Sequence, residues 1–260
     1  MTLAHVIPSQ GRERVSALAS LGDEVFVLRQ PSQQQIDVYD AATFALHHEI
    51  AVPGLGKCPS NRCLYASDLH NDSVHRVKLS GSNAVEKWKV ARRPFGLSVN
   101  KAHNVVVACY DANTLQEYTT HGSLVREIPV QAAGQNSWHA VQLSNGDYAV
   151  CHFTSPGVVS VVGVNGQVVS SYRQTSDGRQ MKCPRGLAVT KNDDILVADS
   201  DNNRILLIQR SKGCVQDLDL PVDGGIQGQR GLYLDESRGR LYVSEWSGQH
   251  RVLVFDSTMF

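Results

Sequence analysis

An internal repeat limits the possible folds of this chain more than any other feature of its sequence. Short apolar segments separated by polar turns recur in the same order from one end to the other. The clearest copy contains three of them, at 183–189, 194–199 and 203–208. Repeats that each hold several short strands are typical of propeller blades, which are small antiparallel sheets packed face to face around an axis.

The third strand of each copy shows how many blades to expect. Its first apolar residue recurs with a period of about 40 to 45 residues, which is typical of propellers. These residues are Ile36, Val74, Leu115, Val158, Ile205 and Val252. Because one blade cannot bury its faces alone, the sequence predicts one all-β domain over residues 1–260, a six-bladed propeller of four-stranded antiparallel blades.

The ends of the chain predict how the ring closes. The last copy ends with its third strand at 251–255, and too few residues follow for a fourth strand. The segment 3–7 precedes the first copy without a partner, so we expect it to complete the last blade. The second copy runs from Pro59 to Cys63 almost without a first strand, which predicts an irregular blade and an opening in the ring.

The start of the first strand carries glycine in three copies, as Gly96, Gly186 and Gly231. Inner strands crowd the axis there, and a side chain would collide with its neighbours. The fourth copy has His139 at this position, so we expect its ring at the mouth of the central channel, near His152.

The clearest copy resembles the NHL repeat. The matching residues are Pro184-Arg-Gly-Leu-Ala-Val189, Leu196-Val-Ala-Asp199 and Asn202-Asn-Arg-Ile205. The other copies extend the resemblance over nearly the whole chain, and 64–68 and 241–245 are more distantly similar to YWTD propellers. The resemblance implies a six-bladed ligand-binding scaffold. Relatives include the substrate- or RNA-recognition part of tripartite-motif ubiquitin ligases and a lyase that amidates peptide hormones, and fold alone does not choose among them.

Composition excludes some partners and compartments. The chain has 25 Lys plus Arg and 25 Asp plus Glu, so it is not a strongly cationic domain, although one face can still be basic. No apolar run approaches the length of about 20 residues that spans a bilayer, and the N-terminus has no secretory pattern. We therefore expect a cytoplasmic protein without a membrane partner, its six cysteines reduced.

One face of the ring is the expected binding surface. If the strands of a blade are named a to d from the axis outward, the loops before strand a and between strands b and c share one face, here named the bc face. The loops before strand a contribute Arg62, Arg93, Trp138, His139, Arg185 and Arg230. The loops after strand b contribute His152 and Trp246. Arginine and tryptophan are the residues of binding hot spots. Asp199 and Asn203, in contrast, fit a structural role in the b to c turn.

The leading hypothesis is a non-catalytic scaffold that binds a protein or peptide segment on the bc face, with no cofactor, and one setting for it is substrate recognition in a ubiquitin-ligase-type protein. The alternative is single-stranded RNA, since Lys87, Lys89, Arg92 and Arg93 lie near Trp88 and lead into that face. Enzyme activity stays open but less favoured.

A metal-dependent lyase or lactonase is the second alternative. His139 and His152 are the only pair of histidines that this alternative can use, and a catalytic zinc site needs about three protein ligands. Asp68, Asp199 and Glu245 end equivalent strands and form a partial acidic ring of the kind that calcium requires. The sequence supplies no third histidine at an equivalent position, so we predict no metal ligands.

Overall fold

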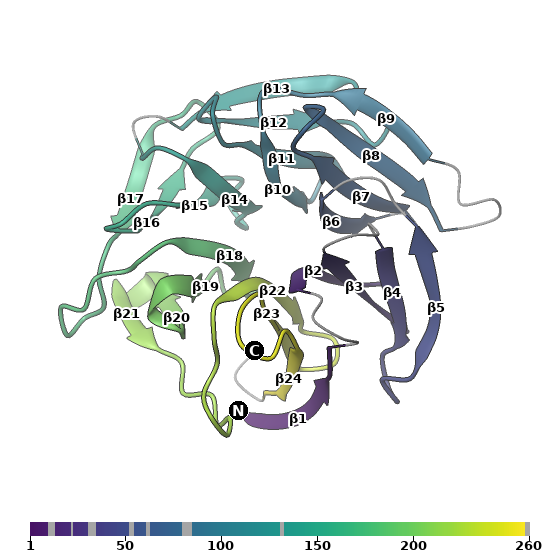
Figure 1. The fold of residues 1–260 in the computed structure, drawn as a ribbon. Coiled ribbons are helices and arrows are strands. Elements are labelled where there is room, and N and C mark those ends of the chain that lie inside the picture. Colours follow the sequence, from purple (N-terminus) through teal and green to yellow (C-terminus); the bar gives the residue numbers. More distant parts are fainter. Residues whose placement is uncertain are drawn as a thin grey trace.

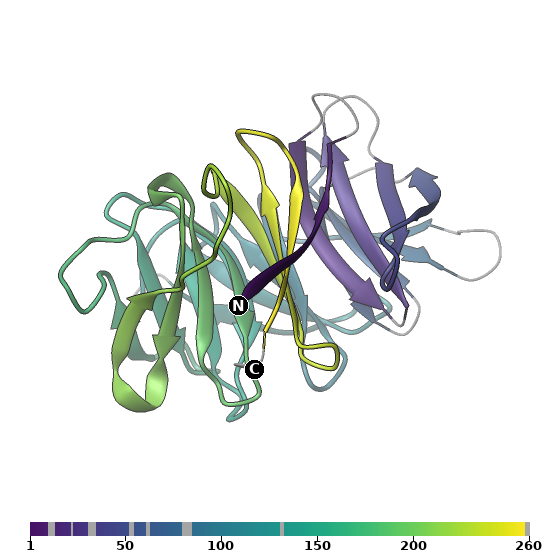
Figure 2. The ribbon, with the colours of Figure 1, turned by 90° about the horizontal axis from the view of Figure 1, so that it is seen from below.

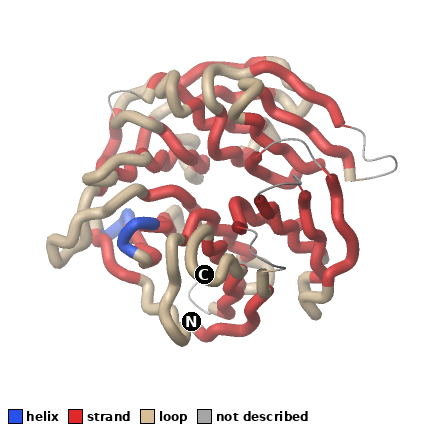
Figure 3. The backbone as a smooth tube through the Cα atoms, viewed as in Figure 1, coloured by secondary structure: helices blue, strands red, loops and turns tan. Residues whose placement is uncertain are grey.

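The structure is a computed structural model, in which the strands form six four-stranded antiparallel blades around an axis (Figure 1). It describes residues 1–9, 14–21, 23–30, 35–51, 55–60, 63–79, 85–130 and 133–257. Two short 3₁₀ turns, η1 (Ser200–Asn202) and η2 (Arg210–Lys212), are the only helical segments in this described part (Figure 3). The predicted all-β, six-bladed propeller is confirmed.

The strands follow one another from the axis to the rim in each blade. Blade 1 contains β2 (Arg14–Leu21), β3 (Glu24–Gln30), β4 (Gln35–Asp40) and β5 (Leu46–Ala51). Blade 2 contains β6 (Leu55–Ser60), β7 (Cys63–Asp68), β8 (Ser73–Lys78) and β9 (Val85–Lys89). Blade 3 contains β10 (Pro94–Val99), β11 (Val105–Cys109), β12 (Thr114–Tyr118) and β13 (Leu124–Pro129). Blade 4 contains β14 (Ser137–Gln142), β15 (Tyr148–His152), β16 (Val158–Val162) and β17 (Val168–Tyr172). Blade 5 contains β18 (Pro184–Val189), β19 (Ile195–Asp199), β20 (Arg204–Gln209) and β21 (Cys214–Asp217). Blade 6 contains β22 (Gln229–Asp235), β23 (Arg240–Glu245), β24 (Val252–Asp256) and β1 (Thr2–Ile7).

The N-terminal strand closes the ring as predicted. β1 pairs antiparallel with β24, from Thr2 opposite Asp256 to Ile7 opposite Val252. Both ends of the chain therefore lie at the sixth blade, as Figures 1 and 2 show. Ile7 is only 1% exposed, so this strand also contributes to the core between blades 6 and 1.

The expectation of an irregular second blade is wrong. β6 begins at Leu55 and pairs with β7 as far as Ser60 opposite Cys63. The inner strands β2, β6, β10, β14, β18 and β22 contact one another in turn, so the ring is closed on this side as well. Pro59 obscured the strand in the sequence, yet proline is tolerated in β6 because this strand is the inner edge of its sheet.

Short polar side chains fasten the loop between strands b and c to the next blade. Asp72, Asn113 and Asn203 adopt left-handed backbone angles, which asparagine and aspartate tolerate better than other residues. Their side-chain oxygens accept the backbone N–H groups that precede the next inner strand, those of Arg93 (2.8 Å), Asn136 (2.7 Å) and Gly228 (2.7 Å). Asn203 therefore has a structural role, but its side chain joins blade 5 to blade 6 instead of bonding within the b to c turn as expected.

Arg29 links the first blade to the segment that closes the ring. Its guanidinium is buried, lies 2.5 Å from a carboxylate oxygen of Asp37, and donates hydrogen bonds to the hydroxyl of Tyr39 and the carbonyl of Pro8. Because Asp37 would be left as a buried charge without its cation, we expect Arg29→Met to lower the free energy of unfolding by about 3–5 kcal/mol, measured by urea denaturation.

Replacing both members of that buried pair provides the control. In the double variant Arg29→Met, Asp37→Leu, neither charge remains to be desolvated, so most of the lost stability should return. A single Arg29→Met variant as stable as the wild type would contradict this role.

Candidate functional site

The inner strands of blades 3 to 6 each contain a bulge near their beginning. The regular pairing is interrupted between Pro94 and Leu97, Ser137 and His139, Pro184 and Leu187, and Gln229 and Leu232. A bulge redirects a side chain away from the sheet. The residues at equivalent positions within these interruptions are Phe95, Trp138, Arg185 and Arg230.

A second set of side chains follows the second strand of a blade on the same face. Tyr110 comes directly after β11, Phe153 after β15 and Trp246 after β23. Together the two sets place large side chains on the bc face around the channel mouth. All of them are partly exposed, so they remain available to a ligand.

Trp138 is the centre of this surface. Its ring centroid lies 4.2 Å from that of Phe95, 4.7 Å from that of Phe153 and 6.1 Å from that of Tyr110. The first two pairs are tilted, with interplanar angles of 35° and 37°, and the third is edge-on at 79°. Four aromatic side chains from blades 3 and 4 therefore form one connected platform.

Arginine side chains extend the platform around the mouth. The guanidinium carbon of Arg230 lies 4.0 Å from the ring centroid of Trp246 and 5.2 Å from that of Trp138. Arg185 lies over Phe153 at 4.8 Å, and Arg14 over Trp246 at 5.0 Å. These are cation–π distances.

Arg93 completes the set at the blade 3 end. Its guanidinium carbon lies 5.0 Å from the ring centroid of Tyr110 and 5.5 Å from that of Phe95. The same side chain forms an ion pair with Asp111 at 3.3 Å. We call the nine residues the arginine–aromatic cluster: Arg14, Arg93, Phe95, Tyr110, Trp138, Phe153, Arg185, Arg230 and Trp246.

Positive charge in this cluster is poorly compensated. No described residue forms an ion pair or a side-chain hydrogen bond with Arg230, and burial, together with the charges of Arg185 and Arg14, lowers its pKa to about 9. Burial also lowers the pKa of Arg185, whose Nε is buried without a hydrogen bond to any described residue. The nearest carboxylate oxygen to Arg185, from Asp201, lies 4.0 Å away. The field at the channel mouth therefore favours an anion.

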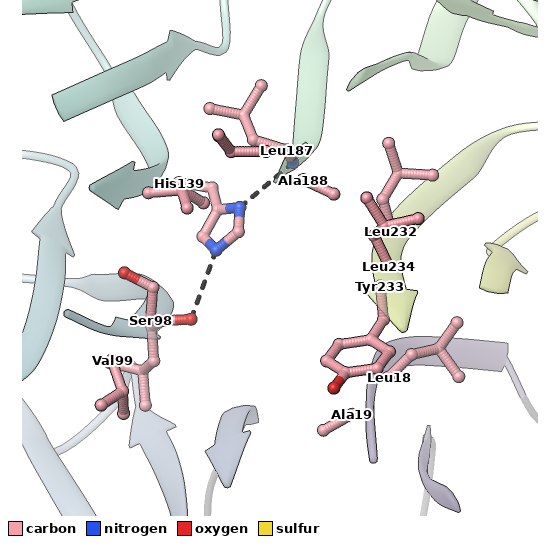
Figure 4. A pocket seen from close by; sticks show the side chains of 13 residues that line it. Leu18, Ala19, Ser98, Val99, His139, Leu187, Ala188, Leu232, Tyr233 and Leu234 are labelled. Atoms are coloured by element: carbon pink, nitrogen blue, oxygen red, sulfur yellow. Dashed lines mark hydrogen bonds between the residues drawn. The ribbon is translucent and has the colours of Figure 1, made fainter. Parts of the chain in front are cut away.

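His139 lies on the inner strand β14 and lines the central channel. Its Nδ1 accepts the backbone N–H of Leu187, and its Nε2 lies 3.3 Å from the carbonyl oxygen of Leu97, so the neutral ring with hydrogen on Nε2 fits both partners (Figure 4). Burial lowers its pKa to about 4. The ring projects into a cavity of about 210 Å³ lined mostly by aliphatic side chains of the inner strands. His139 thus joins blades 3 and 5 through blade 4.

His152 does not join His139 in one site. Its side chain is fully buried, with a ring that a Cβ on Gly134 would approach to 2.8 Å, and neither ring nitrogen has a hydrogen-bond partner among the described residues. Burial lowers its pKa to about 4 as well. The expectation that His152 belongs to the exposed binding surface is therefore wrong.

The expected acidic ring is occupied by local contacts. Asp199 accepts hydrogen bonds from the backbone N–H of Lys182 and from the side chains of Asn202 and Arg204. Glu245 holds Arg251 in an ion pair at 2.8 Å. In the part of the chain that the structure describes, no three His, Cys, Asp or Glu side chains come close enough together to hold a metal ion.

Of the residues predicted from sequence, Arg93, Trp138, Arg185, Arg230 and Trp246 come together in the cluster. Arg62 lies outside the described residues. The five cysteines whose side chains are described are free thiols, and Cys109 and Cys151 are fully buried, as expected for packing residues; Cys58 lies outside this set.

Sequence reasoning missed four members of the cluster. Phe95 precedes Gly96 just as Arg185 precedes Gly186, so the repeat itself marked this position. Tyr110 and Phe153 follow the second strand, as Trp246 does, and the same alignment would have found them. Arg14 carried no such signal, because its place beside Trp246 depends on the meeting of the first and last blades.

Glycine allows the inner strands to come close enough for these contacts. A Cβ at Gly96 would lie 2.5 Å from the carbonyl oxygen of Trp138, and one at Gly186 would lie 2.5 Å from that of Arg230. Both distances are shorter than any normal contact. The predicted crowding of the inner strands is confirmed, and it is what brings the bulged residues of neighbouring blades together.

Comparison with known families agrees with this architecture. A sequence model of the NHL repeat matches residues 181–206, which cover β18, β19 and the beginning of β20. The fifth blade of this β-propeller therefore matches the NHL repeat. A comparison with curated proteins found no significant match.

Solved structures share the propeller fold of this chain at low sequence identity. A streptogramin B lyase superposes with a TM-score of 0.68 and 11% identity, covering 96% of both chains. The hydrazine synthase of Kuenenia stuttgartiensis superposes with a TM-score of 0.69 and 18% identity, covering 98% of this chain and 78% of the other. The WD40 propeller domain of Doa1 superposes with a TM-score of 0.67 and 12% identity, covering 99% of this chain and 97% of the other. At these identities the likeness concerns the fold alone.

No helix in the described ranges is long and apolar enough to cross a bilayer.

Proposed function

We propose that this propeller is a recognition scaffold that binds a protein or peptide segment on its bc face. The arginine–aromatic cluster is the observation that supports the proposal. One setting for such a scaffold is substrate recognition in a ubiquitin-ligase-type protein, in which case the ligase activity itself would lie outside this sequence.

The composition and the packing of the cluster both suit a protein partner. Tryptophan, tyrosine and arginine dominate interface hot spots because they bury a large area and make directional contacts. Here the rings of Phe95 and Phe153 already contact that of Trp138, so little side-chain freedom remains to be lost when a ligand binds. Such preorganisation favours tight binding of a short segment.

Single-stranded RNA fits this surface less well. Sequence-tolerant RNA binding uses aromatic faces that are free to stack on bases. Arg230 and Arg14 lie over the ring of Trp246, while Phe95, Phe153 and arginines surround Trp138. In the basic stretch of blade 2, Trp88 packs between Tyr65 and Tyr118.

The enzyme alternatives lack a suitable side-chain arrangement in the described part of the chain. His139 already uses both ring nitrogens for contacts with the backbone, and His152 is enclosed in the core. Asp199 and Glu245 hold arginines of their own blades. These contacts favour structural roles for the residues that a lyase or a lactonase would need.

Substitution of the central tryptophan tests the proposed function. The full chain is used to select binders from a random peptide library, and the affinities of the synthetic peptides are measured by fluorescence anisotropy. Because Trp138 contacts both the aromatic rings and two arginines, we expect Trp138→Ala to weaken binding by about 30-fold or more, as for a hot-spot residue.

Two further variants separate recognition from folding. Trp138→Phe keeps an aromatic ring at the centre and should recover part of the affinity. Leu124→Ala changes an exposed residue on the outer strand β13 and should leave binding unchanged. If no peptide is selected while a labelled random-sequence RNA binds with an affinity that falls steeply with salt, the chain recognises RNA and the proposal is wrong.

A further inference from the structure

Three guanidinium groups meet on the bc face. Arg14, Arg185 and Arg230 belong to β2, β18 and β22, the inner strands of blades 1, 5 and 6, which are consecutive around the ring. Arg230 shares Trp246 with Arg14, at 4.0 and 5.0 Å, and shares Trp138 with Arg185, at 5.2 and 5.4 Å. Two indole rings from different blades therefore gather three positive charges.

Two of the three charges, those of Arg14 and Arg230, have no carboxylate partner among the described residues, and the carboxylate oxygen of Asp201 lies 4.0 Å from Arg185. Arg204, on strand β20 of blade 5, lies 2.7 Å from a carboxylate oxygen of Asp199. No described residue forms an ion pair or a side-chain hydrogen bond with Arg14 or Arg230, although Arg230 is only partly exposed. A partly buried cation without a counter-charge is unfavourable, so a molecule that supplies the negative charge gains affinity.

The stacking also determines which part of each guanidinium remains free. An arginine that lies over an indole ring uses the face of its guanidinium, and the N–H groups on the edge stay available in the plane of the group. A carboxylate presents two oxygens in one plane and accepts such N–H groups in pairs. Aromatic rings beside the arginines offer an apolar surface next to this position.

We propose that Arg14, Arg185 and Arg230 bind the carboxylate of an aspartate or glutamate side chain in the partner segment, while Phe95 and Phe153 contact an apolar residue next to it. This inference rests on the proposed function, because it specifies the chemistry of the segment that the bc face recognises. The partner is thus an acidic segment that contains an apolar or aromatic residue.

Peptides selected on the full chain test the carboxylate directly. Each is resynthesised with its Asp and Glu residues replaced by Asn and Gln, and separately with an amidated C-terminus. Because hydrogen bonds between charged groups are the strong ones, we expect the amide versions to bind about tenfold more weakly or worse, and C-terminal amidation to have no effect. In Arg230→Met the acidic and amide versions should bind equally.

Thermal unfolding of the same variant supplies a second readout. Arg230→Met removes a partly buried charge that no described residue pairs with, so its melting temperature should rise by about 2–4 °C although binding is lost. Lys212→Met is the matched control, because Lys212 is an exposed cation in η2, on the loop between strands c and d at the opposite face. It should change neither binding nor melting temperature.

Each contrary result has a distinct meaning. If peptides are selected but their amide versions bind equally well, the carboxylate inference is wrong and the proposed function stands. If C-terminal amidation alone abolishes binding, a terminal carboxylate replaces the acidic side chain and the inference is overturned. If no peptide is selected at all, both proposals are wrong.

Discussion

Deletion of β1, residues Thr2–Ile7, is expected to lower the free energy of unfolding by at least about 4 kcal/mol, because this strand completes the sixth blade. Ile7 is buried between blades 6 and 1, and the ring of His5 stacks on that of Phe44 at 4.3 Å. Removing the strand exposes these contacts and leaves the hydrogen-bonding edge of β24 open to solvent. Urea denaturation of the truncated chain gives the measurement.

A circular permutant tests whether the stability depends on β1 being paired with β24, and not on the chain beginning with this segment. Thr2 pairs with Asp256, so a short linker from residue 257 to Thr2 would let the same segment fold back on β24 as a hairpin. We expect this permutant to recover most of the stability of the wild type. Equal melting temperatures of the wild-type and truncated chains would refute a closing role for β1.

Acidification is expected to destabilise the propeller well before its carboxylates titrate. His139 and His152 both have a pKa lowered to about 4 by burial, whereas a histidine in the unfolded chain titrates near 6.5. Between these values the unfolded chain binds more protons than the folded chain. The stability is therefore fully present above about pH 6.5 and is lost as the pH falls toward 4, by up to about 3 kcal/mol for each histidine.

Variants of the two histidines test this assignment. Urea denaturation at about pH 7.5, 6 and 5 should show a steady loss of stability, to which His75, whose pKa burial also lowers, adds in the same direction. His152→Leu should flatten the dependence, because an apolar side chain replaces the buried ring. His139→Leu should also lower the stability at neutral pH, since it breaks contacts to Leu97 and Leu187. A stability independent of pH in this range would contradict the prediction.

The repeat was enough to predict the blades and the order of their strands. Each third-strand position read from the sequence, from Ile36 to Val252, lies in a third strand of the structure. The second blade was the exception, because Pro59 looked like a break although an inner edge strand tolerates it. Local pattern succeeds here because strand alternation and turn residues are properties of neighbouring positions.

For the candidate site, the sequence predicted which face of the propeller carries it but not how its residues are grouped there. The repeat position before Gly186 and Gly231 identified Arg185 and Arg230, and a consistent alignment would have added Phe95. The sequence also put His139 and His152 in one group, since both are histidines of the same blade. In the fold, one ring turns into the channel and the other is enclosed by the core, because a side chain's surroundings depend on the adjacent blade.

The arginines of the cluster show most clearly what the sequence pattern does not predict. Residue pattern alone established six blades, a closing N-terminal strand and a bc face rich in arginine and tryptophan. It did not reveal that Arg14, Arg185 and Arg230 share two indole rings, nor that no described residue balances Arg14 and Arg230. The contacts at Trp246 join residues from the beginning and the end of the chain, those at Trp138 join blade 4 to blades 5 and 6, and all of them depend on the closed ring, which brings these blades together on one face.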